Sequence, residues 1–151
     1  MVSSKEGETS VPLAVEDERI TTKLNMIMQM AIMVKYRTGE LVSDLQLRDA
    51  DASIRDNMVE VLLDMNSRGN VSYMGILECR LLDADGRQMN QRRTNLAVYR
   101  KLLRRVDLAL TEGDFRPPYK VEVVISPDGR TDVPPEDMIK GNRIAQTLAV
   151  R

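Results

Sequence analysis

The chain has 151 residues, of which 42% are hydrophobic and 30% charged, and its net charge at neutral pH is −1. This length and apolar content are enough to bury a core, which excludes a wholly disordered chain. Histidine is absent and Cys79 is the only cysteine. This excludes the usual general base, Ser-His and Cys-His nucleophile pairs, an intramolecular disulfide and cysteine-based zinc sites. We therefore expect no enzymatic activity, catalytic residue, metal, cofactor or small-molecule substrate.

The N-terminal part is predicted to be a tail followed by an apolar helix. Residues 1–14 show no apolar period, so we expect a mobile tail there and a single α+β domain over residues 15–151. From Val15 to about Val34, apolar residues recur at spacings of three and four, which predicts a helix. Such a helix, when apolar nearly all round, is either central in the core or packs against a second copy. The predicted self-association surface of a homo-oligomer consists of Met26, Met28, Met30 and Met33.

A second helix is predicted to begin at Asp49 or Asp51, whose carboxylate can cap the first turn, and to end near Met65. Its inner face would consist of Ile54, Met58, Val61, Leu62 and Met65. Three acidic residues spaced four apart form a separate stripe: Asp56, Glu60 and Asp64. Because like charges at this spacing repel each other, the stripe is expected to face solvent or a basic partner.

The C-terminal half is predicted to be strand, helix, strand and helix. Alternating apolar residues predict strands over residues 71–82 and 119–125, and residues 87–90 either pair back as a hairpin or lead into a helix. That third helix would run from about Gln91 or Thr94 to Thr111, with a core stripe of Leu96, Tyr99, Leu103, Val106 and Leu110. A last helix is expected from Pro134 or Pro135 to about Ala149. The predicted fold class is therefore α+β, with a helical N-terminal half of two helices, a small sheet covered by helices, and a short C-terminal helix.

The strongest asymmetry is a basic block between Gly86 and Arg105, which contains no acidic residue. Its seven cations are Arg87, Arg92, Arg93, Arg100, Lys101, Arg104 and Arg105, and the rest of the chain has 15 basic residues against 23 acidic ones. On the third predicted helix most of these cations would share one face, opposite the apolar stripe, as a basic amphipathic helix. Backbone N–H groups and guanidinium groups at the start of that helix would together suit an anion.

Three kinds of anion compete for this basic face. The first is an acidic protein surface, which is the chain's own acidic stripe, a second copy of the chain or a partner protein. The second is nucleic-acid phosphate. The isoelectric point of about 5.6 and the scarcity of aromatic residues argue against it. The third is an anionic membrane surface, which is not favoured because no exposed apolar anchor is evident nearby.

One segment resembles a known family. A helix followed by Arg116-Pro117-Pro118-Tyr119-Lys120 and a strand is similar to a segment of rhabdovirus matrix proteins. The similar segment covers less than a third of the chain, and no function is carried over from it.

The sequence thus predicts a non-enzymatic, self-associating structural or interaction protein that acts through a methionine-rich helix and a basic amphipathic helix. The alternatives are a nucleic-acid-binding structural protein, such as those of viruses, and a matrix-type protein on an anionic membrane. The N-terminus is polar, and no apolar stretch reaches the roughly 20 residues needed to span a bilayer. We expect an intracellular protein, located in the cytoplasm or, if viral, in the host-cell cytoplasm.

Overall fold

The computed structural model describes residues 7–15, 18–26, 29–30, 38–110, 113 and 115–151, and for residues 7–26 it describes the backbone alone. The chain divides into two compact units, Met1–Arg37 and Thr38–Arg151. In the first unit, strands β1 (Gly7–Val15) and β2 (Glu18–Met26) pair antiparallel. The helix predicted from Val15 onward is therefore wrong over residues 18–26, and its remainder lies outside the described residues or in the short described stretch 29–30. The division into a tail of residues 1–14 and a domain from residue 15 stays a prediction.

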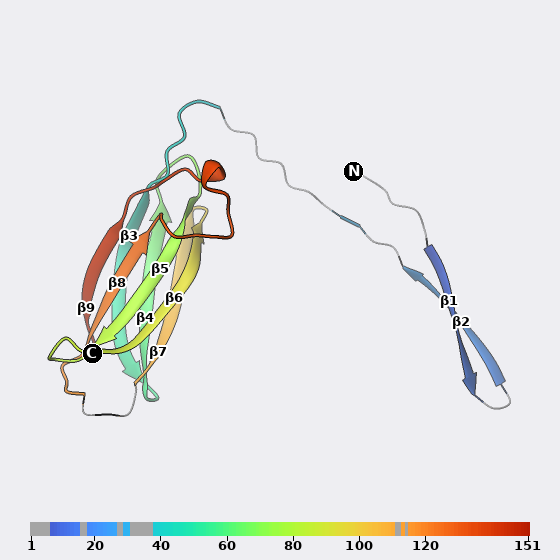
Figure 1. The fold of residues 1–151 in the computed structure, drawn as a ribbon, viewed down its shortest axis with the longest axis horizontal. Helices are drawn as coiled ribbons and strands as arrows, with labels where there is room; N and C mark the ends of the chain where they lie inside the picture. The colour runs from blue at the N-terminus through green and yellow to red at the C-terminus, as the bar shows by residue number, and fades with distance from the viewer. Residues whose placement is uncertain (1–6, 16–17, 27–28, 31–37, 111–112, 114) are drawn as a thin grey trace. The chain divides into compact units, whose positions relative to one another are not determined.

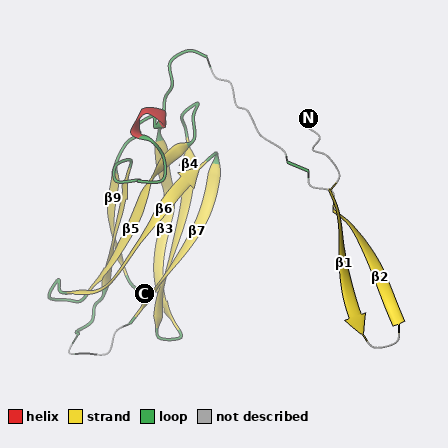
Figure 2. Ribbon diagram, turned by 45° about the vertical axis from the view of Figure 1, so that its right-hand side comes forward, coloured by secondary structure: helices red, strands yellow, loops and turns green. Residues whose placement is uncertain are grey.

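The second unit consists of two antiparallel sheets packed face to face (Figure 1). One sheet has the order β3-β4-β7 and the other the order β6-β5-β8-β9. The strands are β3 (Leu45–Arg55), β4 (Met58–Ser67), β5 (Tyr73–Leu82), β6 (Gln88–Val98), β7 (Lys101–Ala109), β8 (Lys120–Ser126) and β9 (Ile144–Ala149). Between β8 and β9, Pro135–Asp137 form a short 3₁₀ turn (Figure 2). The α+β class is therefore wrong for the described residues, which form a β-sandwich.

The core lies between the two sheets and follows a period of two along each strand. In β5 and β8 the buried side chains alternate with partly exposed ones, as Val121, Val123 and Ile125 show. Aliphatic and β-branched side chains of this kind pack well on a pleated, half-buried surface. The strands predicted over residues 71–82 and 119–125 are confirmed, as is the hairpin option for residues 87–90, which begin β6.

The second predicted helix is a β-hairpin instead, formed by β3 and β4. Asp56 and Asn57 connect the two strands with φ angles of 46° and 60°. Two consecutive positive φ angles are typical of the tight type I′ turn, whose twist matches that of paired strands. In β4 the buried apolar residues are Val59, Val61, Leu63 and Met65, which is a period of two. Leu62 and Met58, which a helix would have buried, lie on the other face of the strand.

The third predicted helix is instead two strands, β6 and β7, which lie in different sheets and are joined by a short connection; we call this pair the β6–β7 arch. Leu96, Val98, Val106 and Leu108 are buried, whereas Tyr99 and Leu103 of the predicted helical stripe are 63% and 71% exposed. The expected basic amphipathic helix is therefore wrong. The last predicted helix is wrong as well, because its residues form the 3₁₀ turn, a loop and strand β9.

Candidate functional site

The predicted basic residues lie on or directly before the β6–β7 arch. Strand β6 is an edge of the four-stranded sheet and β7 an edge of the three-stranded sheet, and only Tyr99 and Arg100 connect them. The arch therefore passes from one sheet to the other and forms one side of the sandwich. Arg92 and Arg93 lie on β6, Arg100 in the connection, and Lys101, Arg104 and Arg105 on β7.

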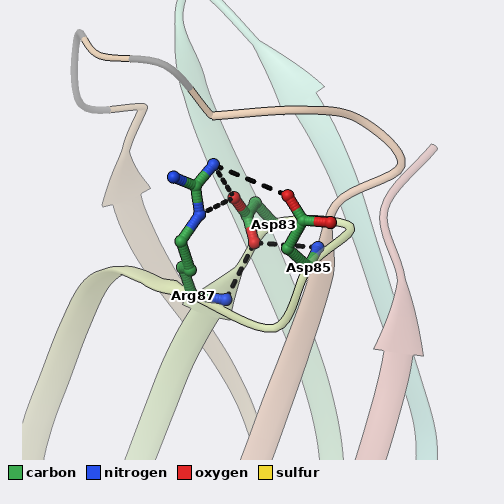
Figure 3. Close-up of polar contacts among 3 residues, drawn as sticks. All are labelled: Asp83, Asp85 and Arg87. Atoms are coloured by element: carbon green, nitrogen blue, oxygen red, sulfur yellow. Dashed lines mark hydrogen bonds and ion pairs between the residues drawn. The ribbon is translucent and has the colours of Figure 1, made fainter.

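Arg87 is paired inside its own turn (Figure 3). Its Nε and Nη2 atoms lie 2.9 Å and 2.8 Å from Oδ2 of Asp83, and its Nη2 lies 3.7 Å from Oδ2 of Asp85. Oδ1 of Asp83 accepts hydrogen bonds from the backbone N–H groups of Asp85 and Arg87. Burial raises the pKa of the Asp83 carboxyl, but these hydrogen bonds and the Arg87 charge outweigh it and leave the pKa below its usual value. Arg87 thus holds a turn together.

Arg105 is also paired within the chain. Its Nη1 lies 2.7 Å from Oε2 of Glu60 on the neighbouring strand β4, and its Nε donates to Asp107 over 2.8 Å. Glu60 is only 5% exposed and also lies 3.8 Å from Nε of Arg55. One member of the predicted acidic stripe therefore meets one member of the basic block.

The rest of that acidic stripe forms no ion pair with the basic block among the described residues. Asp64 is the register partner of Leu103, but its carboxylate lies 3.9 Å from Nη1 of Arg48, and Asp56 is in the β3–β4 turn. Glu60 and Asp64 therefore share one face of β4, while Asp56 lies outside that strand.

Five cations of the block form no ion pair with any described residue: Arg92, Arg93, Arg100, Lys101 and Arg104. We call these five residues the basic seam. All five are exposed. Their charges are therefore available to an external anion.

The strand register shows that two of these cations, Arg92 and Arg104, occupy positions that face the core. Arg92 is paired with Cys79 and Arg104 with Leu63, and both of these partners are buried in the core. Arg92 and Arg104 therefore occupy inward-facing positions, from which an edge strand still lets a long side chain reach solvent. Charges at such positions prevent a free edge from pairing with another chain. Protection of the edges is thus one role of these two arginines.

Two large apolar side chains are exposed near some of these cations. Tyr99 lies beside Arg100 at the tip of the arch, and Leu103 lies between Lys101 and Arg105 on the outer face of β7. Tyrosine and arginine are enriched at the energetically important positions of protein interfaces. The β7 end of the arch therefore combines positive charge with exposed apolar surface, whereas Arg93 lies on the outer face of the other sheet.

A second candidate site, which was not predicted from the sequence, is a groove of about 380 Å³ on the outer face of the four-stranded sheet. Arg93 lines it, together with residues from β5, β8 and the β8–β9 loop. The alternating pattern of β5 and β8 could have predicted which of their side chains line the groove, since every second side chain of a strand points outward. The loop residues that complete it are distant in sequence and carry no local pattern.

The predicted methionine surface is described only in part. Met26 ends strand β2, Met30 is 73% exposed, and Met28 and Met33 lie outside the described residues. Self-association through these four methionines therefore stays a prediction.

Cys79 is fully buried at the centre of β5, where burial and the nearby Glu78 charge raise the pKa of its thiol to about 12. A thiol of this kind is protonated at neutral pH and is a poor nucleophile. Among the residues that the structure describes, no group of three or more Cys, Asp and Glu side chains could hold a metal ion. The described segments also contain no helix that is long and apolar enough to cross a membrane.

Comparison of the chain with models of protein families and with curated proteins finds no match.

Proposed function

We propose that this chain is a non-enzymatic interaction module that binds an acidic segment of a protein through the β6–β7 side of its sandwich. The observation that carries the proposal is the basic seam, five exposed cations that form no ion pair with a described residue, together with exposed Tyr99 and Leu103. Among the described residues, carboxylates of the chain neutralise only Arg87 and Arg105 of the original block. The positive charge that remains is matched by a partner of opposite sign.

The apolar residues favour a protein over a nucleic acid as that partner. Leu103 is exposed in the middle of β7, where a phosphate backbone gains nothing from it. A protein segment can cover Leu103 and pair with the neighbouring cations at the same time, which is how interfaces combine an apolar centre with a charged rim. The overall acidity of the chain also opposes a polyanion as long as nucleic acid.

Nucleic-acid binding is retained as a second candidate because of Tyr99. An exposed aromatic ring flanked by Arg and Lys is the arrangement on which single-stranded bases stack. If a nucleic acid is the partner, its affinity will fall steeply with salt, because each phosphate contact releases a counterion. If the partner instead contacts Leu103, part of the affinity will persist at high salt, because salt does not weaken apolar contacts.

The test compares a labelled short polyglutamate peptide, a polyglutamine peptide of equal length and an oligothymidylate, each titrated into the full chain at low and at high salt. We expect polyglutamate to bind best. We expect Arg100→Glu combined with Arg104→Glu to weaken it at least tenfold, or about 1.4 kcal/mol. Leu103→Ala should cost about 1 kcal/mol or more if Leu103 is an anchor of the interface.

The matched control is Arg68→Glu combined with Lys120→Glu, which reverses two exposed cations outside the basic seam. Equal losses in the two double variants would show attraction by net charge alone and would overturn the assigned site. Preference for the oligothymidylate would transfer the site to the nucleic-acid candidate. Light scattering of the unliganded chain shows whether a second copy is the acidic partner.

A further inference from the structure

The groove on the outer face of the four-stranded sheet has two arginines at opposite edges of its floor. Arg93 comes from β6, while Arg143 directly precedes β9, so the two residues are separated by the width of the sheet, about 15 Å between their backbones at the usual strand spacing. Their long side chains can both reach toward the middle. Neither forms an ion pair with a described residue.

The floor between them is apolar at its centre and offers hydrogen-bond donors. Ile76 of β5 and Val124 of β8 form the apolar part. The Ser126 hydroxyl oxygen accepts a hydrogen bond from the backbone N–H of Asp128, which leaves the hydroxyl proton free to be donated.

Arg80 supplies an observation of a different kind. Its Nε is buried and has no hydrogen-bond partner among the described groups, although Glu78 lies 3.4 Å away. A buried donor without a partner is costly, and such groups in native proteins call for an explanation. Its Nη2 is already engaged by Glu122 over 2.9 Å. The groove thus contains one buried guanidinium donor, Nε of Arg80, that makes no hydrogen bond to a described group, although Arg80 is ion-paired with both carboxylates.

Arg93 is held in position by the loop that follows β8. A Cβ atom added to Gly129, which has a φ of 91°, would lie 2.7 Å from Nη2 of Arg93. The guanidinium therefore packs directly against this glycine. Arg130 fixes the same loop to β6, because its Nη1 donates to the Leu96 carbonyl over 3.0 Å and its Nε to Asp132 over 2.8 Å. A pre-positioned cation loses little entropy when it binds an anion.

The charge balance of the groove limits which anion fits. The lining contains Arg80, Arg93 and Arg143 against Glu78 and Asp128, so the cations exceed the carboxylates by one. Lys140 and Glu122, which pair with Asp128 and Arg80, leave that excess unchanged. One negative charge neutralises the site, whereas a phosphate dianion would be repelled by the two acidic side chains. The volume is at the lower end of the range for ligand pockets.

We propose that this groove is a carboxylate-binding site, in which Arg93 and Arg143 bind the carboxylate and Ile76 and Val124 contact a short aliphatic part of the same ligand. The carboxylate belongs either to a small free acid or to an acidic side chain of a bound peptide. The site does not depend on the function proposed above. It shares Arg93 with the basic seam but is otherwise built from different residues.

The experiment is a chemical-shift titration of the full chain with sodium propionate, and in parallel with propionamide, inorganic phosphate and two capped peptides that differ only by one Glu or Gln. We expect propionate to shift the resonances of Ile76, Val124 and Ser126 with millimolar affinity, and propionamide to have no effect. Stronger binding of the Glu peptide than of propionate would identify a peptide side chain as the source.

The decisive variants are Arg143→Gln and Gly129→Ala, which remove one cation and displace the other. Each is expected to weaken propionate binding at least fivefold, while Lys120→Gln on the same outer face leaves it unchanged. Equal binding of propionate and propionamide, tighter binding of phosphate, or unchanged affinity in Arg143→Gln would overturn the proposal. Loss of polyglutamate binding in the Arg100 and Arg104 variant alone would leave it intact.

Discussion

At the scale of single residues, the buried polar groups Asp83 and Tyr73 both have hydrogen-bond partners. Asp83 is almost fully buried yet keeps its charge, because two backbone N–H groups and the Arg87 guanidinium bind it. Tyr73 is buried and donates its hydroxyl proton to the Asn142 carbonyl over 2.8 Å. Burial and the Asp128 charge raise the pKa of Tyr73 to about 12, so the hydroxyl stays neutral and able to donate over the physiological range.

The lowered pKa of Asp83 predicts an acid-dependent stability. The folded state holds the ionised carboxyl more strongly than the unfolded chain does, where its pKa is about 3.9. The stabilisation is therefore complete from about one pH unit above the unfolded pKa, and it is lost as pH falls from there through the lowered pKa of the folded state. Asp83→Asn keeps an oxygen for the backbone donors but removes the ion pair, so it should lower the unfolding midpoint at pH 7 and flatten its dependence on acid.

Urea unfolding between pH 2 and 7 measures this prediction. Asp85→Asn is the matched control, because Asp85 is exposed and its contact with Arg87 is longer. If the two variants have the same acid profile, Asp83 does not contribute the stabilisation assigned to it.

At the scale of elements, the interpretations that failed did so where two periods fit the same residues. In residues 58–65, Met58, Val61, Leu62 and Met65 fit a helix, while Val59, Val61, Leu63 and Met65 fit a strand. The apolar pattern of β4 alone does not decide between them. The deciding local signal was Asp56-Asn57, a dipeptide that tolerates positive φ and marks a tight hairpin turn. The predicted second helix places this dipeptide in its interior.

Substitutions in this turn distinguish a hairpin from a helix, because the two structures predict opposite effects of glycine on stability. Asn57 has a φ of 60°, so Asn57→Val should destabilise the protein by about 1–2 kcal/mol, the cost of a left-handed conformation for a β-branched residue. Asn57→Gly should be neutral or stabilising, since glycine has no penalty there. In a helix, the same glycine would instead cost roughly 1 kcal/mol relative to a good helix former.

Chemical denaturation of the two variants measures both effects against the parent chain. A destabilising glycine together with a tolerated valine would contradict the hairpin. Asn66→Gly, in the strand β4 rather than in the turn, is the control and should be destabilising.

At the scale of the whole molecule, two sets of contacts join the sheets of the sandwich, one along each side. On one side, the β6–β7 arch passes between them, and Asn90 donates to the Ala109 carbonyl over 2.9 Å. On the other side, the backbone of Arg151 exchanges hydrogen bonds with Ile54 and Ala52 of β3. Asn142, in the loop before β9, adds side-chain hydrogen bonds to β3 on this second side. The two sheets are thereby connected on both sides, while β6 and β7 remain unpaired edge strands on the first side.

Asn142 should be the side chain on which the connection on the second side depends most. Its Oδ1 accepts from the Leu45 N–H and its Nδ2 donates to the Leu45 carbonyl, both over 2.8 Å. Asn142→Ala leaves both backbone groups of a buried residue without partners, so it should destabilise the protein by about 1–3 kcal/mol.

Urea unfolding, together with hydrogen exchange at the Leu45 amide, measures this effect. Asn66→Ala removes an amide for which no hydrogen bond is described, and should change stability by less than about 0.5 kcal/mol. A similar small change in Asn142→Ala would show that this connection rests on the backbone pairs alone.

The sequence by itself determined that the chain has a core, that residues 71–82 and 119–125 are strands, and that positive charge is concentrated between Gly86 and Arg105. These features depend on composition and on unambiguous alternation. Only the tertiary structure decided that the basic block is an arch joining two sheets, since Leu103 and Tyr99 would be core in a helix and are surface in this arch. It also decided which cations are neutralised, because Glu60 meets Arg105 across strands 45 residues apart in sequence. Pairing between distant strands determines these contacts, and no short-range pattern records it.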